Sequence, residues 1–344
     1  MENYQAWAEE VLEKVKEKMV WVSGKNKDII PYTTDANGNY DDRSSEEKEW
    51  NHDDGLNWWT NGFWGGIMWQ MYHAEGDNKY QKEAISLENR LEKAFDNFDL
   101  LDHDVGFLWL HTAVAHYRLT DNPTARKRGL RAAAVLASRY CPAGEYIRAW
   151  NRPGLSQMII DCVMNLPLLF WAADQGAGDH YRQTAIHHLN SVLQNIVRED
   201  GSCNHIVEFD EATGEVLAAP GGQGYGENSS WSRGQAWAIY GLALAYRYTK
   251  KLSYLNTAKQ VAHYFLANIS LTDYVSLIDF RAPEEPVYYD TTAAACAACG
   301  LLEIAEWVSE YEKPLYEKSA WKIYEKLTRD FSDWNPDTDG LLQC

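Results

Sequence analysis

The sequence predicts an all-α fold in which an outer ring of helices surrounds an inner one. Helical patterns fill most of the 344 residues, and two kinds of helix alternate along the chain. Segments such as 105–119 and 231–248 are apolar on nearly every side, whereas 181–197 and 254–266 carry a single apolar stripe. Because an all-apolar helix must be buried and a striped one can cover it, the alternation favours two rings. The pattern alone equally allows an irregular all-α protein.

Hydrophobic periodicity and helix-ending residues place about eleven helices along the chain. They span residues 3–20, 60–75, 78–98, 104–119, 123–140, 156–174, 179–198, 231–249, 252–267, 290–309 and 313–330. Several junctions share one form, in which an apolar helix ends, a short polar turn such as LTDNPTAR follows, and a striped helix begins. Their spacing is uneven, so we expect helical hairpins with insertions of different lengths.

Two long spacers, 21–58 and 200–230, interrupt the helices. The second contains a possible strand hairpin, HIVEFD and EVLAA around TG, and then a glycine-rich loop. The spacing of Gly222, Gly224 and Gly226 is not that of a phosphate-binding loop. Long loops in compact domains are often functional, so we expect this one at a mouth of the ring.

Composition narrows the class of protein. The formal net charge of −18 argues against a nucleic-acid or anionic-membrane surface, although arginines in a pocket can still bind a small anion. The 15 Trp and 21 Tyr suit sugar binding, because apolar sugar faces stack on aromatic rings. No apolar run is long enough to span a bilayer, the first residues do not form a signal peptide, and the six cysteines lack a secreted spacing. We therefore expect a cytoplasmic location.

Asp161 is the one formal charge in the apolar run QMIIDCVMNLPLLFW, residues 157–171. A carboxylate there is unfavourable unless it is paired or used. Apolar surroundings favour its protonated form, which suits acid and base chemistry. The alternative is a structural carboxylate that is hydrogen-bonded within the bundle. Pro167 interrupts the predicted helix by removing a backbone donor.

Two other segments hold candidate site residues. Ser229 or Ser230 should cap the helix that begins near residue 231, which places Arg233 in its first turns, where its guanidinium suits a carboxylate. Trp231 and Trp237 would supply walls. The alternative for Arg233 is an ion pair with a neighbouring acidic residue. In NWWTNGFW, Trp58 and Trp59 have the best chance of facing a pocket.

Two further patterns point to structure instead of chemistry. Asp104 precedes a helix, where aspartate is a favoured cap. The CAAC of residues 296–299 has no second cysteine pair, so it predicts close helix packing and no metal.

The motifs NWWTNGFW, HDVGFLW, YIRAWN, MIIDCVMNLPLLFW and SSWSRGQAWAIYGLALAYRYT together resemble the unsaturated glucuronyl hydrolases, glycoside hydrolase family 88. The resemblance runs from about residue 50 to the end of the sequence. The related unsaturated rhamnogalacturonyl hydrolases share the fold but carry Gly-Asn where this chain has Gln235-Ala236. That activity, or a sugar-binding relative that has lost catalysis, stays as an alternative.

The resemblance implies one (α/α)6-barrel domain over residues 1–344 and no metal or organic cofactor. The implied substrates are di- and oligosaccharides that polysaccharide lyases leave from glycosaminoglycans, with a 4,5-unsaturated uronic acid at the non-reducing end. An acid protonates C4 of this enol ether and water adds at C5. The hemiketal then rearranges and releases the neighbouring sugar. One carboxyl group that donates a proton suffices for this chemistry.

The resemblance also assigns roles to individual residues. The family's general acid and base matches Asp161, and its second essential aspartate matches Asp104, which reverses the preference for a mere cap. We expect Asp104 to hold sugar hydroxyls and to shape the proton affinity of Asp161. The substrate contacts carry over to Trp58, Trp150, His205, Gln223, Arg233 and Trp237. We expect a monomer or a weak dimer.

The eleven expected helices fall one short of the twelve of such a barrel, and the sequence stops at DGLLQC. We expect either that the chain continues beyond Cys344 or that the protein is naturally short. A missing inner helix would expose apolar surface and leave the preference for the leaving sugar open.

Overall fold

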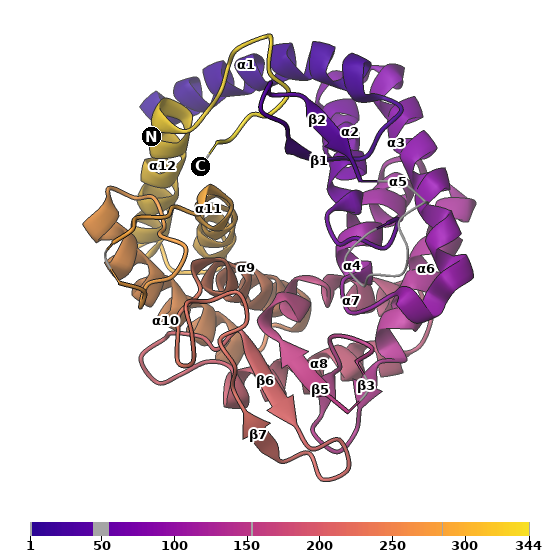
Figure 1. Ribbon diagram of the computed structural model, residues 1–344, viewed down its shortest axis with the longest axis vertical. Coiled ribbons are helices and arrows are strands. Elements are labelled where there is room, and N and C mark those ends of the chain that lie inside the picture. The colour runs from indigo at the N-terminus through magenta and orange to yellow at the C-terminus, as the bar shows by residue number, and fades with distance from the viewer. Residues whose placement is uncertain (1, 44–54, 153, 284, 344) are drawn as a thin grey trace. The chain divides into compact units, whose positions relative to one another are not determined.

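The computed structural model describes residues 2–43, 55–152, 154–283 and 285–343, and most of them lie in helices (Figure 1). The chain separates into two compact units. The first holds residues 1–135 and 332–343, and the second holds residues 136–331. A single domain over residues 1–344 stays a prediction. None of the described helices is both long enough and apolar enough to cross a membrane.

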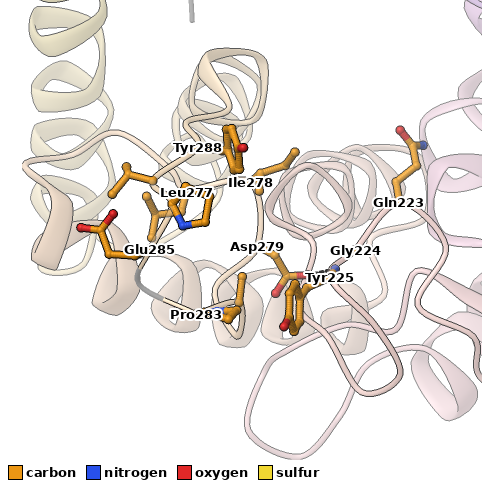
Figure 2. A pocket seen from close by; sticks show the side chains of 12 residues that line it. Gln223, Gly224, Tyr225, Leu277, Ile278, Asp279, Pro283, Glu285 and Tyr288 are labelled. Atoms are coloured by element: carbon orange, nitrogen blue, oxygen red, sulfur yellow. Dashed lines mark hydrogen bonds between the residues drawn. The ribbon is translucent and has the colours of Figure 1, made fainter.

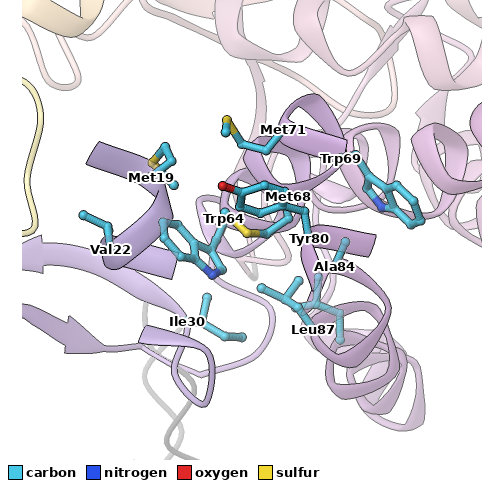
Figure 3. Packing of buried hydrophobic residues seen from close by; sticks show 11 residues of the cluster. Met19, Val22, Ile30, Trp64, Met68, Trp69, Met71, Tyr80, Ala84 and Leu87 are labelled. Atoms are coloured by element: carbon cyan, nitrogen blue, oxygen red, sulfur yellow. The ribbon is translucent and has the colours of Figure 1, made fainter. Parts of the chain in front are cut away.

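The first unit begins with the long helix α1 (Glu2–Asn26) and the short strands β1 (Pro31–Thr34) and β2 (Tyr40–Asp42). Helices α2 (Asn61–Glu75) and α3 (Asn78–Leu91) follow, and then the 3-10 segment η1 (Glu92–Leu100). Apolar side chains of α1, α2 and α3 form one buried cluster (Figure 3). The tail 332–343 joins this unit through Asp339, whose carboxylate accepts the N–H of Tyr40 at 2.9 Å.

The apolar stretch after Asp104 forms α4 (Val105–Trp109), the π-helical turn η2 (Leu110–Val114) and α5 (Ala115–Thr120). This confirms the helix predicted over 104–119. Gly62 lets α2 lie directly against it, since an added Cβ would lie 2.2 Å from the carbonyl oxygen of Phe107. The glycine of NWWTNGFW therefore fixes how close α2 comes to the helix that follows Asp104.

Helix α6 (Pro123–Ala137) leads into the second unit, where strands β3 (Tyr140–Cys141) and β4 (Tyr146–Ile147) pair. Helices α7 (Pro167–Asp174), α8 (Asp179–Asn195), α9 (Ser232–Thr249) and α10 (Leu252–Ile269) come next. The short η4 (Ser270–Thr272), α11 (Thr291–Ala305) and α12 (Lys313–Asp330) complete it. The all-apolar α9 is in contact with the striped α10 and with α11, as the burial argument requires.

The helix predicted over 156–174 is wrong in its first half. Residues Ser156–Ile159 form strand β5, Ile160–Met164 form the 3-10 turn η3, and the helix α7 starts only at Pro167. Proline is favoured in the first turn of a helix, so Pro167 begins this helix and does not interrupt one. A short apolar run has no periodicity that separates a strand from a helix.

Strand β5 forms because a distant segment pairs with it. The predicted hairpin is confirmed as β6 (Ile206–Phe209) and β7 (Val216–Ala218). Strand β6 then pairs antiparallel with β5, with Ile159 opposite Ile206. This pairing was not predicted, and it places the residue after β5 beside the residue before β6.

Helix α9 supports the turn η3 through a glycine. A Cβ added to Gly241 would lie 2.4 Å from Cγ2 of Val163, so only a residue without a side chain allows this approach. The position of η3, which carries Asp161, therefore depends on the surface of α9.

We expect Gly241→Ala to lower the free energy of unfolding by about 1–3 kcal/mol, because the new methyl group must displace Val163. Urea unfolding measures the change. Gly24→Ala is the matched control, since nothing lies within 4 Å of a Cβ added there, and it should be neutral or slightly stabilising. Equal effects of the two substitutions would contradict the close packing.

A second prediction concerns Glu83 on α3, which accepts a hydrogen bond from Nε1 of Trp64 at 2.9 Å. Burial raises the pKa of Glu83 from 4.5 to about 7. Its contribution to stability is therefore present below pH 4.5 and is lost as the pH rises through about 7. We expect Glu83→Gln to gain stability relative to the wild type between about pH 5 and pH 8 in urea unfolding. A difference that does not change with pH, as expected for the exposed control Glu13→Gln, would contradict this.

Candidate active site

Asp161 is the second residue of η3, which follows β5, and its side chain is 15% exposed. Its Oδ2 lies 3.5 Å from Nε2 of His205. Neither of these two buried atoms has a hydrogen-bond partner among the described residues. The pairing of β5 with β6 brings them together, since the N–H of Ile160 donates to the carbonyl of His205 at 3.0 Å. The strand pair thus aims one ring nitrogen at one carboxylate oxygen.

The hydrogen bond at Nδ1 of His205 indicates the protonation of Nε2. Nδ1 accepts the backbone N–H of Gln223 at 2.9 Å. A neutral imidazole has one donor and one acceptor, so the proton lies on Nε2, which faces Asp161. The ring is buried, and its other contact is with Trp231, with centroids 4.3 Å apart. His205 therefore presents a fixed N–H donor to Asp161.

The glycine-rich loop reaches His205 because Gly222 has no side chain. Its φ is +59°, and an added Cβ would lie 2.0 Å from Nδ1 of His205. Only glycine combines this backbone conformation with so close an approach. Gly222 thus serves contact between the loop and the imidazole.

Arg233 lies in the first turn of α9 and forms an ion pair with Asp290, Nε to Oδ2, at 3.0 Å. The ion pair that the sequence left as an alternative is therefore present. It engages Nε, one of the five N–H donors of a guanidinium. The predicted serine cap is wrong, because Trp231 occupies the capping position and the N–H of Ser232 donates to the carbonyl of Ile278. Sequence reasoning missed Asp290, which also accepts the N–H of Ala293 at the start of α11.

Two tryptophans belong to the same unit. Trp237 lies one turn after Arg233 on α9 and is buried. Residues four apart share a helix face, so the two side chains leave α9 on one side. Trp150 is half-buried, and the guanidinium of Arg152 lies 4.7 Å from the centre of its ring.

Asp104 and Trp58 belong to the first unit. Asp104 occupies the capping position of α4, but its side chain makes no capping hydrogen bond. Its Oδ1 instead lies 3.2 Å from Nε2 of His103, which sequence reasoning did not single out. Trp58 is half-buried, with the guanidinium of Arg43 4.3 Å from its ring centre.

The structure therefore brings Asp161, His205 and the backbone of Gln223 into one contact chain, and it places Trp150, Arg233 and Trp237 in the same unit. The catalytic and binding roles of all eight residues stay predictions. A buried carboxylate oxygen opposite a fixed N–H donor can exchange a proton with a bound molecule.

Comparisons with known proteins place the chain in a family. The sequence model of Glycosyl Hydrolase Family 88 matches residues 28–295. An unsaturated glucuronyl hydrolase of Bacillus sp. (strain GL1) is 41% identical over 258 residues, which cover 73% of this chain and 68% of that protein. An unsaturated chondroitin disaccharide hydrolase of Streptococcus pyogenes is 33% identical over 294 residues, 83% of this chain and 73% of that protein.

Solved structures agree over nearly the whole chain. The crystal structure of the Bacillus sp. GL1 unsaturated glucuronyl hydrolase matches with a TM-score of 0.87 at 33% identity, covering 96% of this chain and 87% of that one. A variant of the Streptococcus agalactiae enzyme, solved in complex with dGlcA-GalNAc6S, matches with a TM-score of 0.76 at 30% identity, covering 97% and 82%. The predicted fold class, an all-α (α/α)6 barrel, is confirmed by this likeness. The chain belongs to glycoside hydrolase family 88, the family of the unsaturated glucuronyl hydrolases.

Proposed function

We propose that this enzyme removes the 4,5-unsaturated uronic acid from the non-reducing end of glycosaminoglycan-derived oligosaccharides by hydrating the C4=C5 double bond. The observation that carries the proposal is the 3.5 Å approach of Asp161 Oδ2 to Nε2 of His205. This approach places one buried carboxyl group opposite a ring nitrogen. The contact chain of Asp161, His205 and the Gln223 backbone contains no second acidic group. The names of the relatives support the substrate class.

The chemistry needs a single proton carrier. Asp161 in its acid form donates a proton to C4, and the positive charge that develops at C5 is shared with the ring oxygen. Water adds at C5 and returns a proton to Asp161, so the catalyst is regenerated. The resulting hemiketal opens to a ketone, and the hemiacetal left at C1 then releases the leaving sugar. One water is consumed, and the glycosidic bond is never attacked directly.

We assign to His205 a place facing the carboxyl group and no share in the proton transfer. To become an imidazolium, it would need a proton on Nδ1, which already accepts the N–H of Gln223. Two donors would then face each other. The proton transfer is therefore assigned to Asp161 alone.

The remaining predicted residues suit recognition of the unsaturated sugar. Arg233 keeps further guanidinium donors beyond the Nε that binds Asp290, and a guanidinium matches a carboxylate through two parallel hydrogen bonds. Trp150 and Trp237 offer aromatic faces for the apolar side of a sugar ring. Asp104 is assigned to sugar hydroxyls on the family resemblance. A cytoplasmic location and a monomer or weak dimer stay predictions.

A pocket beside Gln223 bears on the leaving sugar. It has a volume of about 340 Å3 and lies between the glycine-rich loop and residues 277–288 (Figure 2). Tyr225 and Tyr288 line it and are largely exposed. In the described part of the chain its lining includes Asp279 and Glu285 but no lysine or arginine. We propose that an unsulfated leaving sugar occupies this pocket, because a sulfate would meet a carboxylate there without a cation.

We expect Asp161→Asn to fold like the wild type and to lose about 10² to 10⁴ in kcat, because the amide cannot donate the proton. The assay follows the loss of ultraviolet absorbance as the conjugated double bond of an unsaturated chondroitin disaccharide disappears. Asp174→Asn, on an exposed carboxylate that pairs with Arg182, is the matched control and should keep full activity.

Activity of Asp161→Asn within tenfold of the wild type would contradict the assignment of Asp161 as the proton donor. Preference for a pectin-derived disaccharide would favour rhamnogalacturonyl hydrolysis instead. Binding of the disaccharide by the wild type without turnover, measured by calorimetry, would indicate a sugar-binding relative.

We expect Glu285→Gln to raise the ratio of kcat/KM for a sulfated over an unsulfated disaccharide by about two- to fivefold, since one exposed charge is removed. Glu215→Gln, in the distant hairpin turn, is the control. An unchanged ratio, or a wild type that prefers the sulfated substrate, would place the leaving sugar elsewhere.

A further inference from the structure

Asp279 is a buried carboxylate, 1% exposed, that neither the sequence motifs nor the proposed chemistry uses. We propose that Asp279 is a positioning residue for catalysis. It holds the glycine-rich loop in the shape that keeps the proton of His205 on Nε2, opposite Asp161. This inference rests on the proposed function.

Asp279 binds the loop near its middle and at its end. Its Oδ2 accepts the backbone N–H of Tyr225 at 3.0 Å (Figure 2). Its Oδ1 accepts the N–H of Ser230 at 3.0 Å and that of Arg281 at 2.8 Å. The backbone adds a further bond, from the N–H of Phe280 to the carbonyl of Ser230 at 3.0 Å. A charge-assisted hydrogen bond is stronger than a neutral one, so this carboxylate is the main clamp on the loop.

One tight turn connects the residue that Asp279 binds, Tyr225, to the contact with His205. The N–H of Gly224 donates to the carbonyl of Gly221 at 2.9 Å, and this turn directs the N–H of Gln223 at Nδ1 of His205. Tyr225, which Asp279 holds, is the next residue after the turn. The direction of the Gln223 N–H therefore depends on where Asp279 keeps Tyr225.

The direction of the Gln223 N–H affects whether Nε2 of His205 presents a proton or a lone pair to Asp161. Without the N–H at Nδ1, the proton of the neutral ring is free to move to Nδ1. Nε2 would then point a lone pair at the carboxylate oxygen, and the N–H that faces Asp161 would be lost. The contact of the ring with Trp231 holds its plane but does not distinguish the two nitrogens. The N–H of Gln223 and the carboxylate of Asp161 therefore both favour the proton on Nε2, and the loop backbone supplies the first of these two contacts.

The substitution Asp279→Asn tests this without a change of size. The amide oxygen can still accept from Ser230 and Arg281, but the amide nitrogen then faces the N–H of Tyr225, donor against donor. Asp210→Asn is the matched control, because Asp210 accepts the N–H groups of Ala212 and Thr213 in the hairpin turn in the same manner. Two readouts are needed, namely the 15N NMR shifts of His205 in the substrate-free protein and kcat on the unsaturated disaccharide.

In the wild type we expect Nδ1 of His205 to resonate as an unprotonated nitrogen and Nε2 as a protonated one, with the signals assigned by their absence in His205→Gln. Asp279→Asn should shift both signals toward a mixture of tautomers. It should also lower kcat about ten- to hundredfold, the effect of losing one hydrogen bond to a charged group. Asp210→Asn should change neither readout.

Several results would overturn the inference. If the wild-type His205 carries its proton on Nδ1, the inference is overturned. This test needs no variant and therefore holds even if Asp279→Asn fails to fold. A fall in kcat with unchanged nitrogen shifts would show a merely structural Asp279, and changed shifts with unchanged kcat would show that the tautomer does not matter. The wild-type spectrum is independent of turnover, so failure of the proposed function and failure of this inference are distinguishable.

Discussion

The antiparallel pairing of β5 with β6 is the interaction on which the candidate site depends. Asp161 follows one strand and His205 precedes the other, so the register of Ile159 with Ile206 sets the distance between their side chains. A slip by one residue would turn both side chains to the opposite face of the sheet. All four residues of β5 are buried.

Close backbone approach then holds the site from two sides. Gly241 of α9 lets η3 lie against that helix, and Gly222 lets the glycine-rich loop touch the imidazole of His205. At both places a single added carbon would lie within 2.4 Å of an existing atom. The elements around Asp161 are therefore packed too tightly for a side chain, and this limits how far the carboxylate can move.

The polar groups near the site follow one pattern. The carboxylates of Asp279 and Asp290 accept backbone N–H groups, and both are nearly fully buried. The facing atoms of Asp161 and His205, in contrast, have no hydrogen-bond partner in the described residues. Buried polar groups are normally satisfied, and exceptions collect where a ligand or a reaction completes them. Asp161 and His205, the pair that we assign to the chemistry, differ in this respect from Asp279 and Asp290.

The sequence by itself determined most of the helices, their two kinds, the hairpin and the family, because helical periodicity and short motifs are local properties of the chain. It also singled out Asp161, since one charge in an apolar run is visible without coordinates. Only the tertiary structure decided that residues 156–159 form a strand, that Arg233 pairs with Asp290, and that Asp279 clamps the loop. Each of these depends on a partner distant in sequence. Such a contact stabilises both segments without producing a periodic residue pattern in either of them.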